Sequence, residues 1–105
     1  MKQIKSIEEL EMEGDEFSIG IFVPKDVNYV TLQFHGVGDE NKQHQFINYL
    51  HPKLVTIKQN IPNCEIACSI TVSTDVVVTF KNLGNYKNRL KFEQFLYKWL
   101  PKNIV

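Results

Sequence analysis

Hydrophobic and polar residues alternate along several stretches of the chain, and this period of two is typical of β-strands with one buried face. The clearest case is residues 28–35, where every second residue is apolar: Val30, Leu32 and Phe34. The same alternation is present at 16–23, 66–72 and 76–80. Turn-forming residues separate 16–23 from 28–35, and 66–72 from 76–80. The pattern therefore predicts antiparallel strands with one face against a core.

Two other stretches have the periodicity of amphipathic helices. After Leu83-Gly84-Asn85, a full core stripe recurs at helical spacing: Phe92, Phe95, Leu96, Trp99 and Leu100. The other helix is expected to begin after Asp39, a favourable N-cap residue, and to end near His51, because a proline follows. Its apolar stripe is shorter: Phe46, Ile47 and Leu50.

The chain also partly repeats itself. Residues 16–53 match residues 65–102 at an offset of 49, and an offset of 48 fits better in the middle. We therefore expect a single domain, 1–105, with an internal repeat of 5–53 and 54–102, and residues 54–61 become a candidate strand. The predicted fold is α+β: a duplicated β(β)βα unit forms an antiparallel sheet of four to six strands, with two helices packed on one face.

The overall composition is that of an ordinary globular domain, with 43% hydrophobic and 23% charged residues. No apolar run approaches the roughly 18 residues of a membrane span, and the first residues lack the apolar region of a signal peptide. Cys64 and Cys68 fall in one predicted strand, about 13 Å apart, which is too far for a disulfide. We therefore expect a cytoplasmic protein that does not associate with a membrane.

Acidic and basic residues are unevenly distributed, although the net charge is zero: residues 1–40 carry −6 and residues 41–105 carry +6. Six carboxylates fall within nine residues: Glu8, Glu9, Glu11, Glu13, Asp15 and Glu16. Gly14-Asp15 is typical of a hairpin turn, which makes 7–13 a strand, whereas Ser6 and Glu9 as a capping box favour a helix. Like charges repel one another on a strand unless a cation approaches. The run has an alternative explanation that requires no binding partner: the charges could protect an edge strand from aggregation.

This acidic run leads to our first functional hypothesis, a protein-binding module. We predict that the run, together with Asp39 and Glu40, binds a basic protein, most simply the phosphate-binding groove of a nuclease-type toxin. The protein would then be a small bacterial immunity or inhibitor protein. By architecture alone, a duplicated hairpin-plus-helix unit is similar to such proteins, and equally to folds that bind single-stranded nucleic acid.

The alternative hypothesis is a protein that binds single-stranded nucleic acid. Alternation places an aromatic residue among hydrogen-bonding groups on the outward sheet face: Tyr29, Thr31, Gln33 and His35. The last helix carries a basic row that includes Lys87, Lys91 and Lys98, which could contact phosphates. A merely solvated face and helix are the simpler interpretations of both features.

Metal binding and catalysis have weaker support in the sequence. His35, Asp39, Glu40, His44 and His51 are potential ligands, but no zinc-binding or nucleotide-binding motif organises them. In the repeat, His51 is equivalent to core-facing Leu100, so we expect it to be partly buried. We predict no enzyme activity, no metal and no cofactor. Exposed sheet edges make a homodimer by sheet extension a further expectation.

Overall fold

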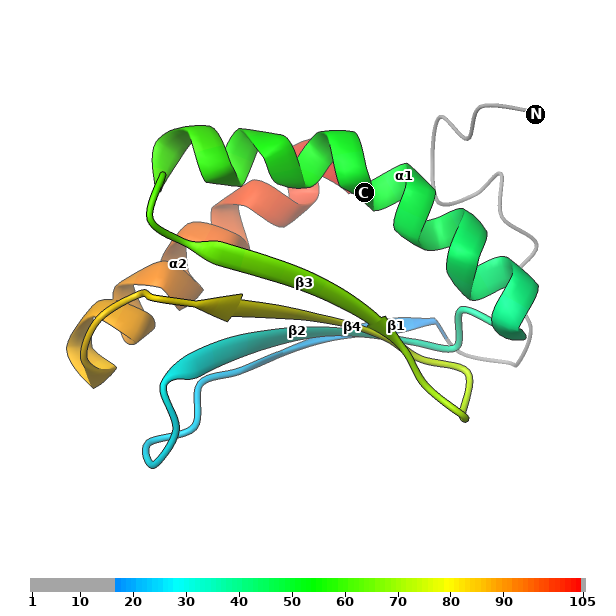
Figure 1. Cartoon of the computed structure of the whole chain (residues 1–105), viewed down its shortest axis with the longest axis horizontal. Coiled ribbons are helices and arrows are strands. Elements are labelled where there is room, and N and C mark those ends of the chain that lie inside the picture. Colours follow the sequence, from blue (N-terminus) through cyan, green and yellow to red (C-terminus); the bar gives the residue numbers. More distant parts are fainter. Residues whose placement is uncertain (1–16, 105) are drawn as a thin grey trace.

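The computed structural model describes residues 17–104, which fold in the order ββαββα. Figure 1 shows a curved sheet beneath two helices. The elements are β1 (Ser18–Phe22), β2 (Tyr29–His35), α1 (Glu40–Asn60), β3 (Glu65–Ile70), β4 (Val76–Lys81) and α2 (Tyr86–Asn103). The predicted α+β class is therefore confirmed.

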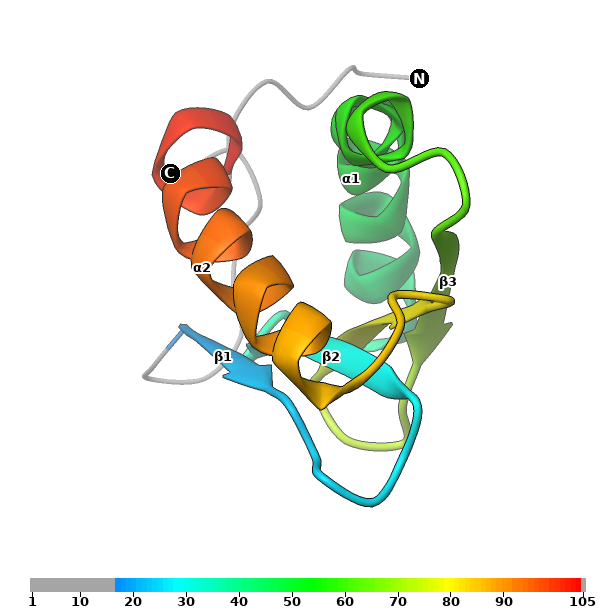
Figure 2. The ribbon, with the colours of Figure 1, turned by 90° about the vertical axis from the view of Figure 1, so that its left-hand side faces the viewer.

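The sheet has four strands in the order β1-β2-β4-β3, and all neighbours are antiparallel. β2 and β4 form its centre, where Leu32 lies opposite Val78. Both helices lie on the same face, as Figure 2 shows, which is the arrangement predicted from the sequence. The described residues form four strands, so the six-strand version of the prediction is not supported by residues 17–104.

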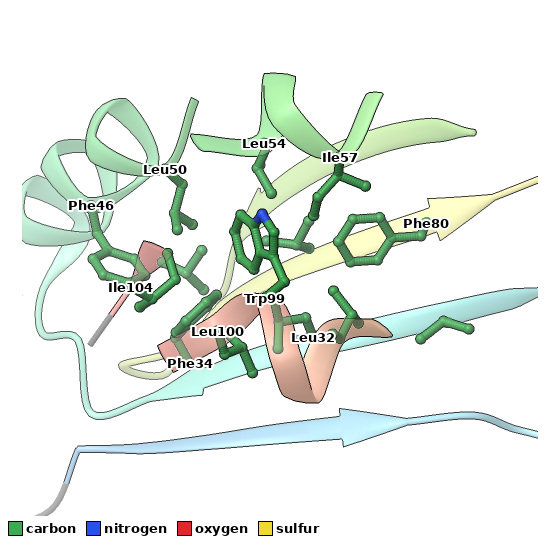
Figure 3. Close-up of a cluster of buried hydrophobic side chains, with 14 of the residues drawn as sticks. Leu32, Phe34, Phe46, Leu50, Leu54, Ile57, Phe80, Trp99, Leu100 and Ile104 are labelled. Carbon is green, nitrogen blue, oxygen red and sulfur yellow. The ribbon is translucent and has the colours of Figure 1, made fainter. Parts of the chain in front are cut away.

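The core lies between the sheet and the two helices (Figure 3). The alternating residues of β2 and β4 point into it, and Phe34 and Phe80 are fully buried. From the helices, Phe46 packs edge-on against Phe34 with ring centroids 4.8 Å apart, and Trp99 donates a hydrogen bond of 2.9 Å to the Thr56 hydroxyl. Burial of these large side chains is the main force that holds the helices on the sheet.

The first helix is longer than predicted, and this corrects two expectations. Residues 54–60 belong to α1 rather than to a strand, and the helix continues through Pro52. Leu50, Leu54 and Ile57 are buried at helical spacing, so packing outweighs the hydrogen bond that proline cannot donate. His51 is exposed rather than partly buried, because its side chain lies away from this stripe.

The two ββα units correspond to one another at shorter offsets than the sequence match indicated. Phe34 and Phe80, the N-caps Asp39 and Asn85, and the buried pair Gln43 and Arg89 are each 46 residues apart. The predicted boundary between residues 53 and 54 falls inside α1. The repeated element order is thus structural, whereas an origin by duplication stays a prediction. The predicted strand at 7–13 and its hairpin turn lie outside the described residues.

Candidate functional site

One face of the sheet is not covered by either helix (Figure 2). Its cross-strand rows follow from the register: Phe22, Thr31, Thr79 and Ala67 form one row, and Gly20, Gln33, Val77 and Ser69 form the next. The predicted residues Tyr29, Thr31, Gln33 and His35 are all half-buried there. We call this surface the open face. In these two rows, hydroxyl and amide side chains alternate with apolar residues and a glycine, so the open face has a mixed polar and apolar character.

Aromatic and basic groups gather at one end of the open face. Phe22 is 47% exposed, and Tyr29 lies opposite Lys81 in the ladder. Just beyond, the Lys25 ammonium lies 5.9 Å from the centre of the Tyr86 ring, within cation–π range. Glu65 is the other neighbour of Lys81, and the exposed Asp26 follows Lys25 in the β1–β2 loop, so carboxylates also lie at this end.

The opposite end of the open face holds a histidine–aspartate pair. His35 Nδ1 lies 2.9 Å from Asp75 Oδ2, while Asp75 Oδ1 accepts a hydrogen bond of 3.4 Å from the Gly36 amide. The pair thus joins the end of β2 to the loop between β3 and β4. Ser18 is the register partner of His35 on β1, but the His35 Nε2 lies over Gly20 instead. These contacts are those of a structural anchor.

Exposed carboxylates mark the start of α1. Asp39 caps the helix by accepting a hydrogen bond of 2.9 Å from the Lys42 amide, as predicted for an N-cap, and Glu40 lies 3.7 Å from His44. Phe17 lies at the same end of the molecule, since its ring packs against Phe34 and Phe46. Glu8, Glu9, Glu11, Glu13, Asp15 and Glu16 lie outside the described residues. In the sequence, they directly precede Phe17.

The predicted nucleic-acid surface is divided by the fold. Lys87, Lys91 and Lys98 are exposed on α2, as expected for a basic row. However, α2 lies on the helix-covered side of the sheet, whereas Tyr29, Thr31, Gln33 and His35 lie on the open face (Figure 2). A single strand of nucleic acid bound across the open face would therefore not lie along this row of lysines.

Two buried polar residues were not singled out from the sequence. Gln43 Nε2 donates to the carbonyls of Gly38 (3.0 Å) and Ser73 (2.9 Å), and its Oε1 accepts from the Thr71 amide at 3.0 Å. It thus ties the start of α1 to the β3–β4 loop. The available signal was position: Gln43 continues the apolar stripe of Phe46 and Leu50 at helical spacing.

Arg89 makes the equivalent contacts at the start of α2. Its guanidinium donates to the carbonyls of Gly84 (2.9 Å) and Pro24 (3.3 Å), which ties this helix to the β1–β2 loop. Among the described residues, its buried Nε has no hydrogen-bond partner. Each helix start is therefore held by a long polar side chain to the hairpin loop of the other unit.

The two cysteines are free thiols. Burial raises the pKa of the Cys64 thiol, an effect that Lys58 partly opposes and Glu65 adds to, and burial also raises the pKa of Cys68. Within residues 17–104, no three His, Cys, Asp or Glu side chains come together as metal ligands would. No described helix is long and apolar enough to cross a membrane.

Comparisons with known proteins give no assignment. Neither protein-family models, nor curated proteins, nor solved structures match this chain.

Proposed function

We propose that this protein is a stoichiometric binding module that inhibits a basic protein, most simply a nuclease-type toxin, through an acidic end. The observation that supports this proposal is the placement of Asp39 and Glu40. Both are exposed at the start of α1, at the same end as Phe17, whose ring packs against Phe46 of this helix, and the run of six carboxylates precedes Phe17 in the sequence. The proposed binding residues are therefore Asp39 and Glu40 at this end, together with the six carboxylates that precede Phe17 in the sequence; we call this set the acidic end.

The physical basis is charge complementarity. A nuclease groove is lined with Lys and Arg, which neutralise the negative phosphates of the substrate. A cluster of carboxylates is also negative and can therefore occupy the groove in place of the phosphates. Opposite charges steer the encounter and can raise the association rate by one to three orders of magnitude at low salt. An inhibitor that occupies the groove needs no catalytic group, pocket or cofactor.

The experiment is capture followed by charge reversal. The full chain is used to capture proteins from the native host, and a captured nuclease is then assayed with increasing amounts of the chain. We expect inhibition at one-to-one stoichiometry. The triple variant Glu9→Lys, Glu11→Lys, Glu13→Lys should retain the fold by circular dichroism and lose both capture and inhibition. A matched variant, Lys87→Glu, Lys91→Glu, Lys98→Glu, should still inhibit, because α2 lies outside the acidic end.

A second candidate is single-stranded nucleic-acid binding at the end of the open face where Phe22, Tyr29 and Lys81 gather. The exposed Phe22 ring and the half-buried Tyr29 ring could stack on bases, and Lys81 with Lys25 would contact phosphates. Fluorescence anisotropy with single-stranded RNA and DNA at low salt distinguishes this function from the first. Binding that falls steeply with salt and is lost in Tyr29→Ala would favour this candidate. Absence of binding at low salt would leave the inhibitor proposal.

A further inference from the structure

Strand β3 forms one edge of the sheet, and no described element covers its outer side. Six consecutive residues of β3 pair with β4 without a bulge, so the strand is regular along its whole length. In Figure 2, β3 is the outermost strand on its side, and α1 lies inward of it above the sheet. The outward N–H and C=O groups of such an edge are free to pair with another strand.

Within β3 itself, this edge lacks the features that normally protect exposed strands; one lysine, Lys58, donates to the Cys64 carbonyl just before the strand begins. Natural edge strands carry lysine, proline, bulges or inward-pointing charges that prevent pairing. Residues 64–72 contain one charged residue, Glu65, and no proline or lysine. The last residue of the strand, Ile70, is 38% exposed, and Val72 in the loop that follows is fully exposed. An unprotected apolar edge of this kind indicates a partner strand.

We propose that the partner is a second copy of this chain, paired antiparallel through β3 about a two-fold axis at Cys68, which gives a continuous eight-stranded sheet. A two-fold axis perpendicular to a sheet makes identical edge strands antiparallel and keeps the helices of both copies on one side. In that symmetry, one residue of the strand lies opposite itself. The apolar side chains of β3 then meet on the helix-covered side of the sheet.

The sequence of β3 selects Cys68 over its neighbour Ala67 as the residue on the axis. With Cys68 on the axis, Ile66 of each copy lies opposite Ile70 of the other, and the exposed Ile70 becomes covered. With Ala67 on the axis, Ile70 would lie opposite Cys64, which is already fully buried in its own chain. Cross-strand pairs of β-branched residues stabilise a sheet, so the first register is favoured.

The proposed dimer is small, because a six-residue strand buries less surface than a standard interface. We therefore expect a reversible dimer with a dissociation constant on the order of micromolar. This pairing does not involve the acidic end, so it is independent of the proposed inhibitor function. Failure of one proposal leaves the other in place.

Sedimentation equilibrium of the full chain between about 1 µM and 1 mM tests the dimer. In the proposed register, Ala67 lies opposite Ser69 of the second copy, and both are exposed in the single chain. Ala67→Lys with Ser69→Lys sets like charges opposite one another twice and should weaken the dimer about tenfold or more. Ala67→Lys with Ser69→Glu sets opposite charges there and should preserve it. Circular dichroism checks that both variants fold.

Three outcomes would overturn the proposal. A wild-type protein that stays monomeric at the highest concentration excludes the dimer. Double variants that both dimerise as the wild type does exclude β3 as the interface. Double variants that are both monomeric exclude the register about Cys68.

Cross-linking provides an independent check of the register. Opposed residues of antiparallel strands have Cα atoms about 4.5–5.5 Å apart, within the range of a disulfide. In a Cys64→Ala background, diamide should take two electrons and two protons from the paired Cys68 thiols and form one disulfide. A covalent dimer is expected on a non-reducing gel, and Cys68→Ala should abolish it. Absence of the covalent dimer at concentrations where the dimer is populated would contradict the register.

Discussion

At the residue scale, Gln43 and Arg89 hold the two halves of the fold together. Both are buried and lie at equivalent places in their helices, and both bond to backbone carbonyls near a hairpin loop of the other unit. Because both side chains are buried, their polar groups would be costly without these hydrogen bonds. These two side chains therefore fix where each helix starts relative to the sheet.

We predict that Gln43→Leu lowers the free energy of unfolding by about 2 to 3 kcal/mol. Leucine fits the volume but leaves the Thr71 amide and the Ser73 carbonyl without their partner. Urea denaturation followed by circular dichroism measures the change. Gln45→Leu, on the exposed side of the same helix, is the matched control and should change stability by less than about 0.5 kcal/mol. Equal effects at the two positions would show that the contacts of Gln43 contribute nothing.

The buried thiols predict a dependence of stability on alkaline pH. Because burial raises the pKa of Cys64 and Cys68, the folded protein keeps these protons at pH values where the unfolded chain loses them. Their contribution to stability is complete below about pH 8.5, the ordinary pKa of the thiol, and is lost as pH rises through the raised values. Urea unfolding of the wild type and of Cys64→Ala with Cys68→Ala, from pH 7 to 10, measures it. The wild type should lose its advantage over the variant as pH rises, whereas a constant difference would refute the prediction.

At the scale of elements, the strands were predicted more accurately than the first helix. Alternation identified β2 and β4 with their inward and outward faces, because one side of each strand is buried and the other is not. The sequence predicts too early an end for α1, because a proline more often ends a helix than lies within it. Proline costs one hydrogen bond within a helix, and the burial of Leu54 and Ile57 beyond it outweighs that loss.

The candidate surfaces show a similar division. Sequence alternation correctly assigned Tyr29, Thr31, Gln33 and His35 to one face, but it could not show that His35 is bonded to Asp75, 40 residues away. That contact depends on how the β3–β4 loop folds against the end of β2. By contrast, the separation of the open face from the α2 lysines could be predicted, because the sequence already places both helices on one side of the sheet.

Capping of α1 by Asp39 can be separated from its proposed role in binding. Asp39→Ala removes the acceptor for the Lys42 amide and should lower the free energy of unfolding by about 1 kcal/mol. Asp39→Asn keeps an acceptor and should leave stability nearly unchanged, while it removes one negative charge from the acidic end. Urea denaturation measures the first effect and partner affinity the second. If Asp39→Asn is destabilised as much as Asp39→Ala, the charge rather than the cap acts on the fold.

At the scale of the whole molecule, residues 17–104 and residues 1–16 carry net charges of opposite sign. Residues 17–104 carry ten basic and six acidic side chains, whereas residues 1–16 carry two basic and six acidic ones. The zero net charge is therefore the sum of a net positive charge on residues 17–104 and a net negative charge on residues 1–16. If the proposed basic partner binds the carboxylates of residues 8–16, the lysines of residues 17–104 repel it, and both the attraction and the repulsion weaken as salt rises.

The association rate of the captured basic protein with the full chain, measured by stopped flow at several salt concentrations, tests the central proposal most directly. If the acidic end steers binding, the wild-type rate should fall steeply as salt rises. The variant Glu9→Lys, Glu11→Lys, Glu13→Lys should associate at least about tenfold more slowly at low salt, with little dependence on salt. Equal rates for wild type and variant, with the same salt dependence, would contradict binding through the acidic end.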